Sequence, residues 1–293
     1  MNDSETDYYH VDGTLLPAGE ATVNVRDRGF MYGDAVFERL RVYGGEPFEW
    51  AAHVDRLERS AARLGFDEVL PPRDDLHDRV TETLDANDLS EASVRLSVSR
   101  GVQGGELTPE PRVDPTITVV VDELPRGGTD GERAWDEPAT LRTVETRRPP
   151  EEALPSAVKT HNYLTGILAR LELEGTDADE ALVRSMEGHV TGGADSNLFL
   201  VHNGTLYTPT ANLPLLPGVT RGVVLDIADG ESFPVETGRY NLTDVREADE
   251  LFLTNATWEV RPVTGIDGYE KPVGPITKLC GRLFDRRVEN ARY

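Results

Sequence analysis

The stretch ALPSAVKTHNYLTGILARLELEG, residues 153–175, contains one of only three lysines in the chain. The other two are Lys271 and Lys278, and every remaining Lys-or-Arg position is an arginine. An arginine stays protonated and cannot supply a free amine, whereas a lysine can do so once burial or neighbouring cations lower its pKa. Because Lys159 stands just before an apolar helical pattern, we take it as a candidate catalytic amine and the other two as ordinary solvated lysines.

Length and composition limit the class of protein. The chain has 293 residues, which is long for one hydrophobic core and sufficient for two domains. It has no apolar run of about 18 residues, the length that predicts a membrane helix, and its beginning, MNDSETDYYH, is not typical of a signal peptide. The single Cys280 excludes an internal disulfide framework and favours a reducing, cytoplasmic location.

The charge of the chain is strongly acidic. There are 30 basic and 53 acidic residues, giving a net charge of −23 that is spread along the sequence. Such a surface is a poor partner for nucleic acid. Many acidic residues with few lysines are typical of a salt-adapted, halophilic protein, in which dissolved salt screens the self-repulsion. A genome-wide preference for arginine codons would explain the arginines but not the excess of acid.

The first part of the chain is predicted to combine strands with two helices. Glycine turns interrupt short apolar segments over residues 10–50, which predicts strands. The spacing then becomes helical, with Val54, Leu57, Ala61 and Leu64 on one face. Alternation in SVRLSVSRG and the apolar run TITVVVDEL predict two more strands. The predicted elements are strands within 10–50, 93–101 and 116–124 and helices at 51–66 and 73–86.

The second part of the chain also mixes helices with strands, after a turn-rich linker at 125–138. A helix follows Lys159, and a hairpin is centred on Asn203-Gly204, a dipeptide that favours two-residue turns. We predict an α+β or α/β protein with a small N-terminal α/β domain at 1–125 and a larger C-terminal domain at 126–293 carrying Lys159. The helix after Lys159 has the apolar stripe Leu164, Ile167, Leu168 and Leu171, and the further predicted elements are strands in 181–185, 197–209 and 250–263 and a helix in 216–228.

A lysine amine that forms a Schiff base serves two kinds of enzyme, aldolases that act on the substrate directly and enzymes that use pyridoxal phosphate. A phosphate site distinguishes them. Gly218-Val219-Thr220 opens a predicted helix, whose free N–H groups favour an anion, and Asn255-Ala256-Thr257 is a second small-residue loop. Arg56 on the first helix can bind a phosphate with two hydrogen bonds. Each feature alone also suits an ordinary capped helix or a solvated side chain.

Taken together, the sequence blocks carry a family resemblance. In order they are DRGFMYGDAVFERLR, HVDRLERSA, SRG, KTHNYL, GGADSNLFLV, LPGVTR and TNATWEVRPV. They resemble the class IV, or fold type IV, pyridoxal phosphate enzymes, which include branched-chain aminotransferases, D-amino acid aminotransferases and aminodeoxychorismate lyases. The blocks extend from about His10 to the last helix, and their order and spacing are more specific than any one of them.

The resemblance implies a role for each matching residue. Lys159 would hold pyridoxal 5'-phosphate as a Schiff base and act as the general base and acid that moves the proton. Arg56, Thr257 and the backbone at the start of the 216–228 helix would bind the phosphate, and Tyr163 would lie near the phenolic oxygen. No metal is implied. The implied cofactor-binding residues are Arg56, Tyr163, Asn197, Val219, Thr220, Ala256 and Thr257.

Several residues are candidates for binding the substrate. Arg41, Arg95 and Arg100 could bind its carboxylate, and a regular strand would place Arg95 and Arg100 on opposite faces, so we expect only one of them in the pocket. The SRG block favours Arg100, because it matches the D-aminotransferase and lyase members. Tyr32 and Phe37 match aromatic pocket positions of the family.

One position departs from the family pattern. Where the pattern has a glutamate that keeps the pyridine nitrogen protonated, this chain has Gly192. A protonated ring is the electron sink of the cofactor, so the loss should weaken it. Asp195 could substitute, a water could bridge, or the enzyme could be slow. Because a glutamate would restore the missing partner, we expect Gly192→Glu to speed the deprotonation step.

Three functions stay open at this point. A transaminase would move an amino group between an amino acid and a 2-oxo acid, and the VFE sequence and KTHNYL favour it. An aminodeoxychorismate lyase would expel pyruvate to leave 4-aminobenzoate, and the short SRGVQGGELTP loop is compatible with it. A cofactor-binding protein of weak activity is the interpretation that Gly192 suggests. The resemblance also implies a homodimer in which a partner loop completes the pocket.

Overall fold

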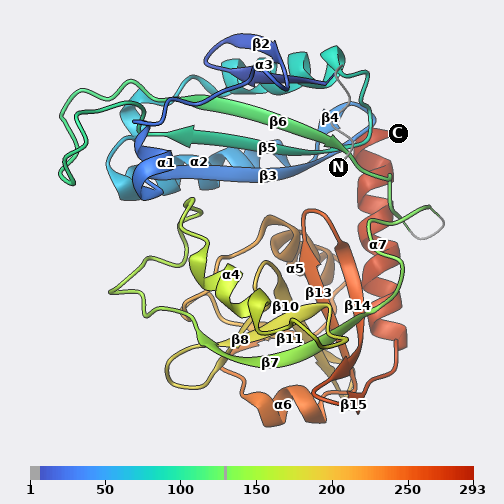
Figure 1. Cartoon of the computed structure of the whole chain (residues 1–293). Helices are drawn as coiled ribbons and strands as arrows, with labels where there is room; N and C mark the ends of the chain where they lie inside the picture. Colours follow the sequence, from blue (N-terminus) through green and yellow to red (C-terminus); the bar gives the residue numbers. More distant parts are fainter. Residues whose placement is uncertain (1–6, 129–130) are drawn as a thin grey trace. The chain divides into compact units, whose positions relative to one another are not determined.

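A computed structural model describes residues 7–128 and 131–293 of the chain (Figure 1). These residues form two compact units, each of which makes most of its contacts within itself. Helices and strands occur in both units, which confirms the predicted mixed α and β class. The first unit consists of 7–126, 158–162 and Arg292, and the second of 127–157, 163–291 and Tyr293.

The first unit is built on a six-stranded sheet with the order β2-β1-β6-β5-β3-β4, in which every pair of neighbouring strands is antiparallel. The strands at both edges are short and those in the middle are longer. Its strands are β1 Tyr8–Val11, β2 Thr14–Pro17, β3 Ala35–Tyr43, β4 Glu46–Pro47, β5 Ala92–Ser99 and β6 Ile117–Glu123, and its helices are α1 Arg28–Tyr32, α2 Trp50–Leu64, α3 Arg73–Ala86 and the 3-10 turn Asp67–Val69.

Helices α2 and α3 cover one face of this sheet. Leu57 of α2 and Leu76 of α3 join Val36, Val94 and Leu96 of the strands in one buried apolar cluster. Because side chains alternate across a strand, these buried positions assign the residues between them to the opposite face. The predicted helices at 51–66 and 73–86 are confirmed, and α2 ends at Gly65, whose φ of 73° provides the left-handed cap.

The second unit contains a nine-stranded mixed sheet with the order β12-β11-β10-β13-β14-β7-β8-β9 and with β15 beside β14. The pairs β7–β8, β7–β14 and β11–β12 are parallel. Its strands are β7 Ala139–Arg147, β8 Glu180–Arg184, β9 Val190–Gly192, β10 Asn197–His202, β11 Thr205–Pro209, β12 Val235–Gly238, β13 Glu250–Asn255, β14 Glu259–Ile266 and β15 Tyr269–Glu270, and its helices are α4 Leu164–Leu171, α5 Val219–Gly230, α6 Leu242–Glu247 and α7 Pro275–Arg292.

The hairpin between β10 and β11 has the turn that the sequence predicted. Asn203 and Gly204 have φ angles of 49° and 79°, both positive. Two-residue hairpins prefer this geometry because its twist matches the twist of the flanking strands, and asparagine and glycine tolerate it best. The prediction of a hairpin centred on this dipeptide is therefore confirmed.

Helix α4 buries a different side from its apolar stripe. Leu164 and Ile167 are 65% and 53% exposed, and Leu168 and Leu171 are also exposed. The buried residues of α4 are Gly166 and Ala169, and the helix packs on β7 and β8. Small side chains allow a helix to approach a sheet closely, which explains why this side of α4 is the buried one. The sequence spacing predicted which apolar residues share a face, but it did not show that this face is exposed.

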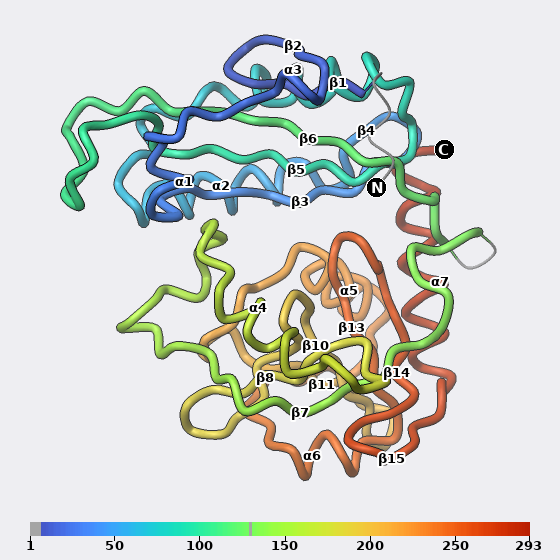
Figure 2. The backbone as a smooth tube through the Cα atoms, in the orientation of Figure 1, coloured from blue at the N-terminus to red at the C-terminus, as the bar shows by residue number. Residues whose placement is uncertain are grey.

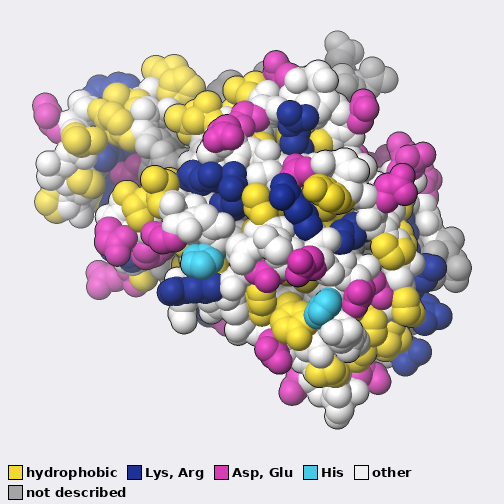
Figure 3. Space-filling view, turned by 90° about the horizontal axis from the view of Figure 1, so that it is seen from below, with side chains coloured by type: hydrophobic (Ala, Val, Ile, Leu, Met, Phe, Trp, Pro, Cys, Tyr) yellow, Lys and Arg dark blue, Asp and Glu magenta, His cyan; other side chains and the backbone are white. Residues whose placement is uncertain are grey.

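The acidic charge is visible on the surface. On the face shown in Figure 3, aspartate and glutamate side chains are scattered among basic and apolar ones rather than gathered in one block. Among the described helices, none combines the length and the apolar character that crossing a bilayer requires.

Candidate active site

Lys159 lies on a segment that extends the edge of the first sheet. Phe37 N donates a hydrogen bond to the Lys159 carbonyl at 3.0 Å, and His161 N donates to the Ala35 carbonyl at 3.0 Å. Lys159 N in turn donates to Ser60 Oγ of α2 at 3.1 Å. In Figure 2 the chain can be followed from β7 to this segment and on to α4. These bonds, rather than the order of the sequence, explain why 158–162 belongs to the first unit.

The side chain of Lys159 points to the face of the sheet that the helices leave uncovered. The antiparallel bridge between Val36 and Thr160 places Lys159 opposite Phe37, on the same face. Lys159 Nζ lies 4.4 Å from the centroid of the Phe37 ring, and Arg95 Cζ lies 3.8 Å from the same centroid. Only 6% of the Lys159 surface is exposed. The buried amine therefore shares an aromatic neighbour with Arg95.

Arg56 is part of a buried ionic cluster between helix α2 and strand β3. Its Nε and Nη2 donate to the two carboxylate oxygens of Glu38 at 2.8 and 2.5 Å, and His53 Nδ1 lies 2.7 Å from Glu38 Oε2. Burial raises the pKa of Glu38, but the charge of Arg56 and the hydrogen bonds from Arg56 and His53 outweigh it and lower this pKa to about 2. Burial lowers the pKa of His53. Glu38 thus holds the guanidinium of Arg56 in a fixed orientation.

The start of α5 has the features of an anion site. The helix has no side-chain hydrogen bond at its N-cap Gly218, so the first N–H groups, including those of Val219 and Thr220, have no partner within the helix. Asn197 fixes the preceding loop, because its Oδ1 accepts from Gly218 N at 3.1 Å and its Nδ2 donates to the Leu216 carbonyl at 3.0 Å. A Cβ at Gly218 would lie 2.2 Å from Asn197 Oδ1, so a side chain here would displace Asn197 from these two hydrogen bonds.

The loop with Ala256 and Thr257 joins β13 to β14. Asn255 fixes its base, because its Oδ1 accepts from Trp258 N at 2.7 Å and its Nδ2 donates to the Asp195 carbonyl at 3.3 Å. Asp195 also lies near Tyr163, whose hydroxyl is 3.5 Å from its Oδ1. The second unit therefore contains a connected set of loops that includes the predicted Tyr163, Ala256 and Thr257.

The backbone at Gly192 argues against the expected benefit of Gly192→Glu. Its φ is +129°, and a Cβ there would lie 2.6 Å from the Ser196 carbonyl oxygen, so a side chain would strain or displace the loop. The carboxylate that holds this loop belongs to Glu180. Its Oε1 accepts from Ala194 N at 3.2 Å and its Oε2 accepts from Ser196 Oγ at 3.1 Å, and burial raises its pKa.

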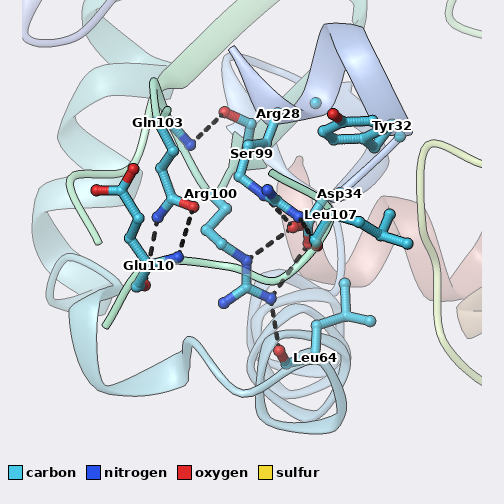
Figure 4. Close-up of polar contacts among 12 residues, drawn as sticks. Arg28, Tyr32, Asp34, Leu64, Ser99, Arg100, Gln103, Leu107 and Glu110 are labelled. Carbon is cyan, nitrogen blue, oxygen red and sulfur yellow. Dashed lines mark hydrogen bonds and ion pairs between the residues drawn. The ribbon is translucent and has the colours of Figure 1, made fainter. Parts of the chain in front are cut away.

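Arg100, the favoured candidate for the substrate carboxylate, is bound within the protein (Figure 4). Its Nε donates to Asp34 Oδ2 at 2.8 Å and its Nη2 to the Leu64 carbonyl at 2.6 Å. Burial raises the pKa of Asp34, but hydrogen bonds from Arg100 and Arg28 outweigh it and lower this pKa. The residue that contacts Phe37 is Arg95 instead. Arg100 follows the last residue of β5, so strand alternation does not determine its direction.

Two other candidates have local partners. The Arg41 guanidinium donates to the Pro125 carbonyl and lies 5.1 Å from the Tyr43 ring. The Tyr32 hydroxyl donates to the Gly105 carbonyl. Of the predicted substrate residues, Phe37 and Arg95 are the ones that the structure brings to Lys159.

Four polar residues of these clusters were missed by the sequence analysis. Glu38 interrupts the apolar strand β3, Glu180 is the first residue of the apolar strand β8, and His161 follows Lys159 by two residues. The fourth is His53, three residues before Arg56 on the same helix. A charged residue inside an otherwise apolar strand is the signal that could have indicated the first two, because such a residue needs a buried partner.

The comparisons with known proteins agree with this architecture. The family model described as Amino-transferase class IV matches residues 35–266. A putative branched-chain-amino-acid aminotransferase of Methanocaldococcus jannaschii is 39% identical over 279 residues, covering 94% of each chain. A D-alanine aminotransferase of Listeria monocytogenes is 34% identical over 288 residues, covering 96% of each.

Solved structures give the same result. The branched-chain aminotransferase of Thermoproteus uzoniensis with norvaline has a TM-score of 0.87 and 26% identity, covering 98% of this chain and 95% of that one. The 4-amino-4-deoxychorismate lyase of Pseudomonas aeruginosa has a TM-score of 0.82 and 29% identity, covering 97% and 100%. A further branched-chain amino acid aminotransferase, 28% identical with a TM-score of 0.87, was solved with pyridoxamine 5'-phosphate.

The two-unit fold and these residues define a fold type IV pyridoxal phosphate enzyme. The chain belongs to the class IV aminotransferase family, whose cofactor is pyridoxal 5'-phosphate. The residues present suit that group. In the first unit a buried lysine supplies an amine, and in the second unit the start of α5 supplies N–H groups that suit a phosphate.

Proposed function

We propose that this protein is a transaminase that moves an amino group between an amino acid and a 2-oxo acid, with the cofactor held through the amine of Lys159. The observation that carries the proposal is the placement of Lys159, whose backbone is bound on both sides and whose buried amine lies over Phe37 beside Arg95. Such positioning is what a general base needs.

The residues of the chain divide the tasks of binding and proton transfer. Bound pyridoxal phosphate supplies the electron sink that makes the substrate Cα–H acidic. Lys159 Nζ would take the proton from that carbon as general base and, as general acid, pass it to the C4′ carbon of the cofactor, the shift that transfer of an amino group requires. Arg56, the N–H groups at the start of α5, and Thr257 would hold the phosphate, and Tyr163 would donate to the phenolic oxygen. Arg95 binds a substrate carboxylate above the apolar ring of Phe37.

A lyase that eliminates pyruvate from 4-amino-4-deoxychorismate is the second candidate function. The observation that favours it is the likeness to the Pseudomonas aeruginosa lyase, which covers the whole of that chain. The same proton transfer at Lys159 would serve either reaction, so the product distinguishes them.

We further propose a homodimer that works in a salt-rich cytoplasm. The exposed apolar stripe of α4 supports self-association, because contiguous exposed apolar side chains are typical of interaction surfaces. The net charge of −23 and the scarcity of lysine support the salt-rich setting.

The test begins with protein purified in high salt. Visible absorbance that bleaches on borohydride reduction, with the label mapped to Lys159 by mass spectrometry, is the expected result. Lys159→Ala should lose both signals, and Lys278→Ala, at an exposed lysine, should keep them. Absorbance that never develops after pyridoxal phosphate is added would contradict the proposal.

The product then identifies the reaction. D-alanine, L-glutamate, branched-chain amino acids and aminodeoxychorismate are offered with a 2-oxo acid. Amino transfer to the oxo acid supports the transaminase, and release of pyruvate with 4-aminobenzoate supports the lyase. A protein that binds the cofactor and transforms none of them is a binding protein of weak activity.

A further inference from the structure

His161 is a second side chain on the face of the sheet that Lys159 occupies. It follows Lys159 by two residues on the same extended segment, so both side chains point to the same side. Its backbone N–H is bound to the Ala35 carbonyl, which fixes its position along β3. The imidazole contacts Phe37 edge-on, with 5.7 Å between ring centroids and 70° between ring planes. Lys159, Arg95 and His161 therefore surround one aromatic ring.

The imidazole has an unused polar atom. His161 Nε2 is buried and has no hydrogen-bond partner among the described residues. Leaving a buried polar atom unpaired costs roughly 1 to 3 kcal/mol, so such an atom in a native protein calls for an explanation, and a role at a functional site is one. Nothing in the fold of the first unit requires a histidine here, because the hydrogen bond along β3 is made by the backbone.

The charge state of His161 suits the recognition of an anion beside Arg95. Burial, and then the charge of Arg95, lower the pKa of His161 to about 4, while Asp27 acts in the opposite direction. The imidazole is therefore neutral near pH 7 and carries one N–H donor. A neutral N–H donor beside the positive charge of Arg95 matches a carboxylate, which accepts several hydrogen bonds.

We propose that His161 is a substrate-binding residue whose Nε2–H donates to an oxygen of the carboxylate bound by Arg95. The proposal rests on the proposed function, since the carboxylate belongs to an amino acid or oxo acid that reacts at Lys159. That carboxylate is either the α-carboxylate common to all such substrates or the second carboxylate of a dicarboxylic one. Phe37 provides the apolar surface that keeps water from the ion pair and so strengthens it.

The test compares two substitutions at one position. His161→Met removes the donor and keeps much of the volume, whereas the amide nitrogen of His161→Gln can replace Nε2. A hydrogen bond to a charged group has a net strength that corresponds to a loss of about tenfold or more when it is removed. We expect His161→Met to raise KM about tenfold with little change in kcat. His161→Gln should have a KM close to that of the original chain.

A binding measurement separates this role from catalysis. Titration calorimetry on the cofactor-loaded protein gives the dissociation constants of glutarate and of valerate for each variant. Equal weakening of both acids by His161→Met identifies the α-carboxylate, and weakening of glutarate alone identifies the second carboxylate. His202→Met, at an exposed histidine of the second unit, is the matched control and should change neither constant.

One outcome would overturn the proposal. Unchanged KM and unchanged dissociation constants in a folded His161→Met protein would leave His161 with a packing role only. Because Nε2 has no partner among the described residues, a packing role predicts that this variant is at least as heat-stable as the original chain. The borohydride label on Lys159 is measured on the same samples, so failure of the proposed function is recognised separately.

Discussion

Substitution of Glu38 tests whether the buried carboxylate holds Arg56 in place. Glu38→Gln keeps the shape of the side chain but removes the negative charge that faces Arg56 and His53. Glu38 is 1% exposed and Arg56 is 5% exposed, so water cannot replace the lost interaction. The variant therefore leaves a buried guanidinium without its counter-ion.

The size of the effect follows from the pKa of Glu38. The folded protein lowers this pKa from 4.5 to about 2. Each unit of difference corresponds to about 1.4 kcal/mol, which gives a contribution of about 3 kcal/mol to stability. Because the folded pKa is the lower one, this contribution is complete above pH 4.5 and is lost as the pH falls towards 2. The value of about 3 kcal/mol agrees with the cost of breaking a buried ion pair by removing one partner, which is roughly 3 to 5 kcal/mol.

The assay is urea unfolding of the original chain and of Glu38→Gln, at pH 7 and at decreasing pH, in constant high salt. The matched control is Glu58→Gln, because Glu58 accepts two hydrogen bonds from Arg73 at 2.8 and 2.5 Å but on an exposed surface. Exposed pairs contribute little, so the unfolding midpoint of the control should hardly move.

Two results are expected from these unfolding curves. Glu38→Gln must lower stability at pH 7 far more than Glu58→Gln, and the difference from the original chain must shrink as acid protonates Glu38. A Glu38→Gln protein that unfolds at the same urea concentration as the control would refute the argument. Weaker binding of pyridoxal phosphate in the variant is the expected companion effect, since Arg56 would lose its fixed orientation.

Three further predictions concern other sites. Arg100→Met should lower the free energy of unfolding by roughly 1 to 3 kcal/mol, because Asp34 loses one of its two arginine partners and keeps Arg28, while KM stays nearly constant; a raised KM in a stable protein would restore Arg100 as a substrate residue. Gly192→Ala should cost about 1 to 3 kcal/mol because of its positive φ, and Gly192→Glu should give no faster half-reaction in stopped-flow measurements. Raising salt from about 0.1 to about 1 M should raise the melting temperature, since the screening length falls from about 10 to about 3 Å; a constant melting temperature would contradict salt adaptation.

Local sequence features determined much of the fold. Helical spacing predicted α2, which spans Trp50–Leu64, and the Asn203-Gly204 dipeptide predicted the hairpin turn. The scarcity of lysine by itself indicated Lys159 as a candidate amine. These inferences succeed because propensity, periodicity and turn chemistry act between residues close in the chain.

Other features depended on residues that are distant in the sequence. The choice between Arg95 and Arg100 required the partners of each guanidinium, and Asp34 binds Arg100 across a separation of 66 residues. The strain that a side chain at position 192 would cause depends on the φ of Gly192 and on the nearby Ser196 carbonyl, and composition shows neither. The exposure of the α4 stripe likewise depends on which side of the helix meets the sheet.

The sequence by itself determined the family and the class of fold and singled out Lys159 as the candidate amine, because each is recorded in local patterns and in the order of motifs. Only the tertiary structure showed that Lys159 extends β3, that Ser60 Oγ binds its backbone from 99 residues away, and that Arg95 and His161 surround the same ring of Phe37. The physical reason is that hydrogen bonds, ion pairs and ring contacts between distant segments form only when the chain closes on itself, and no local pattern specifies those partners.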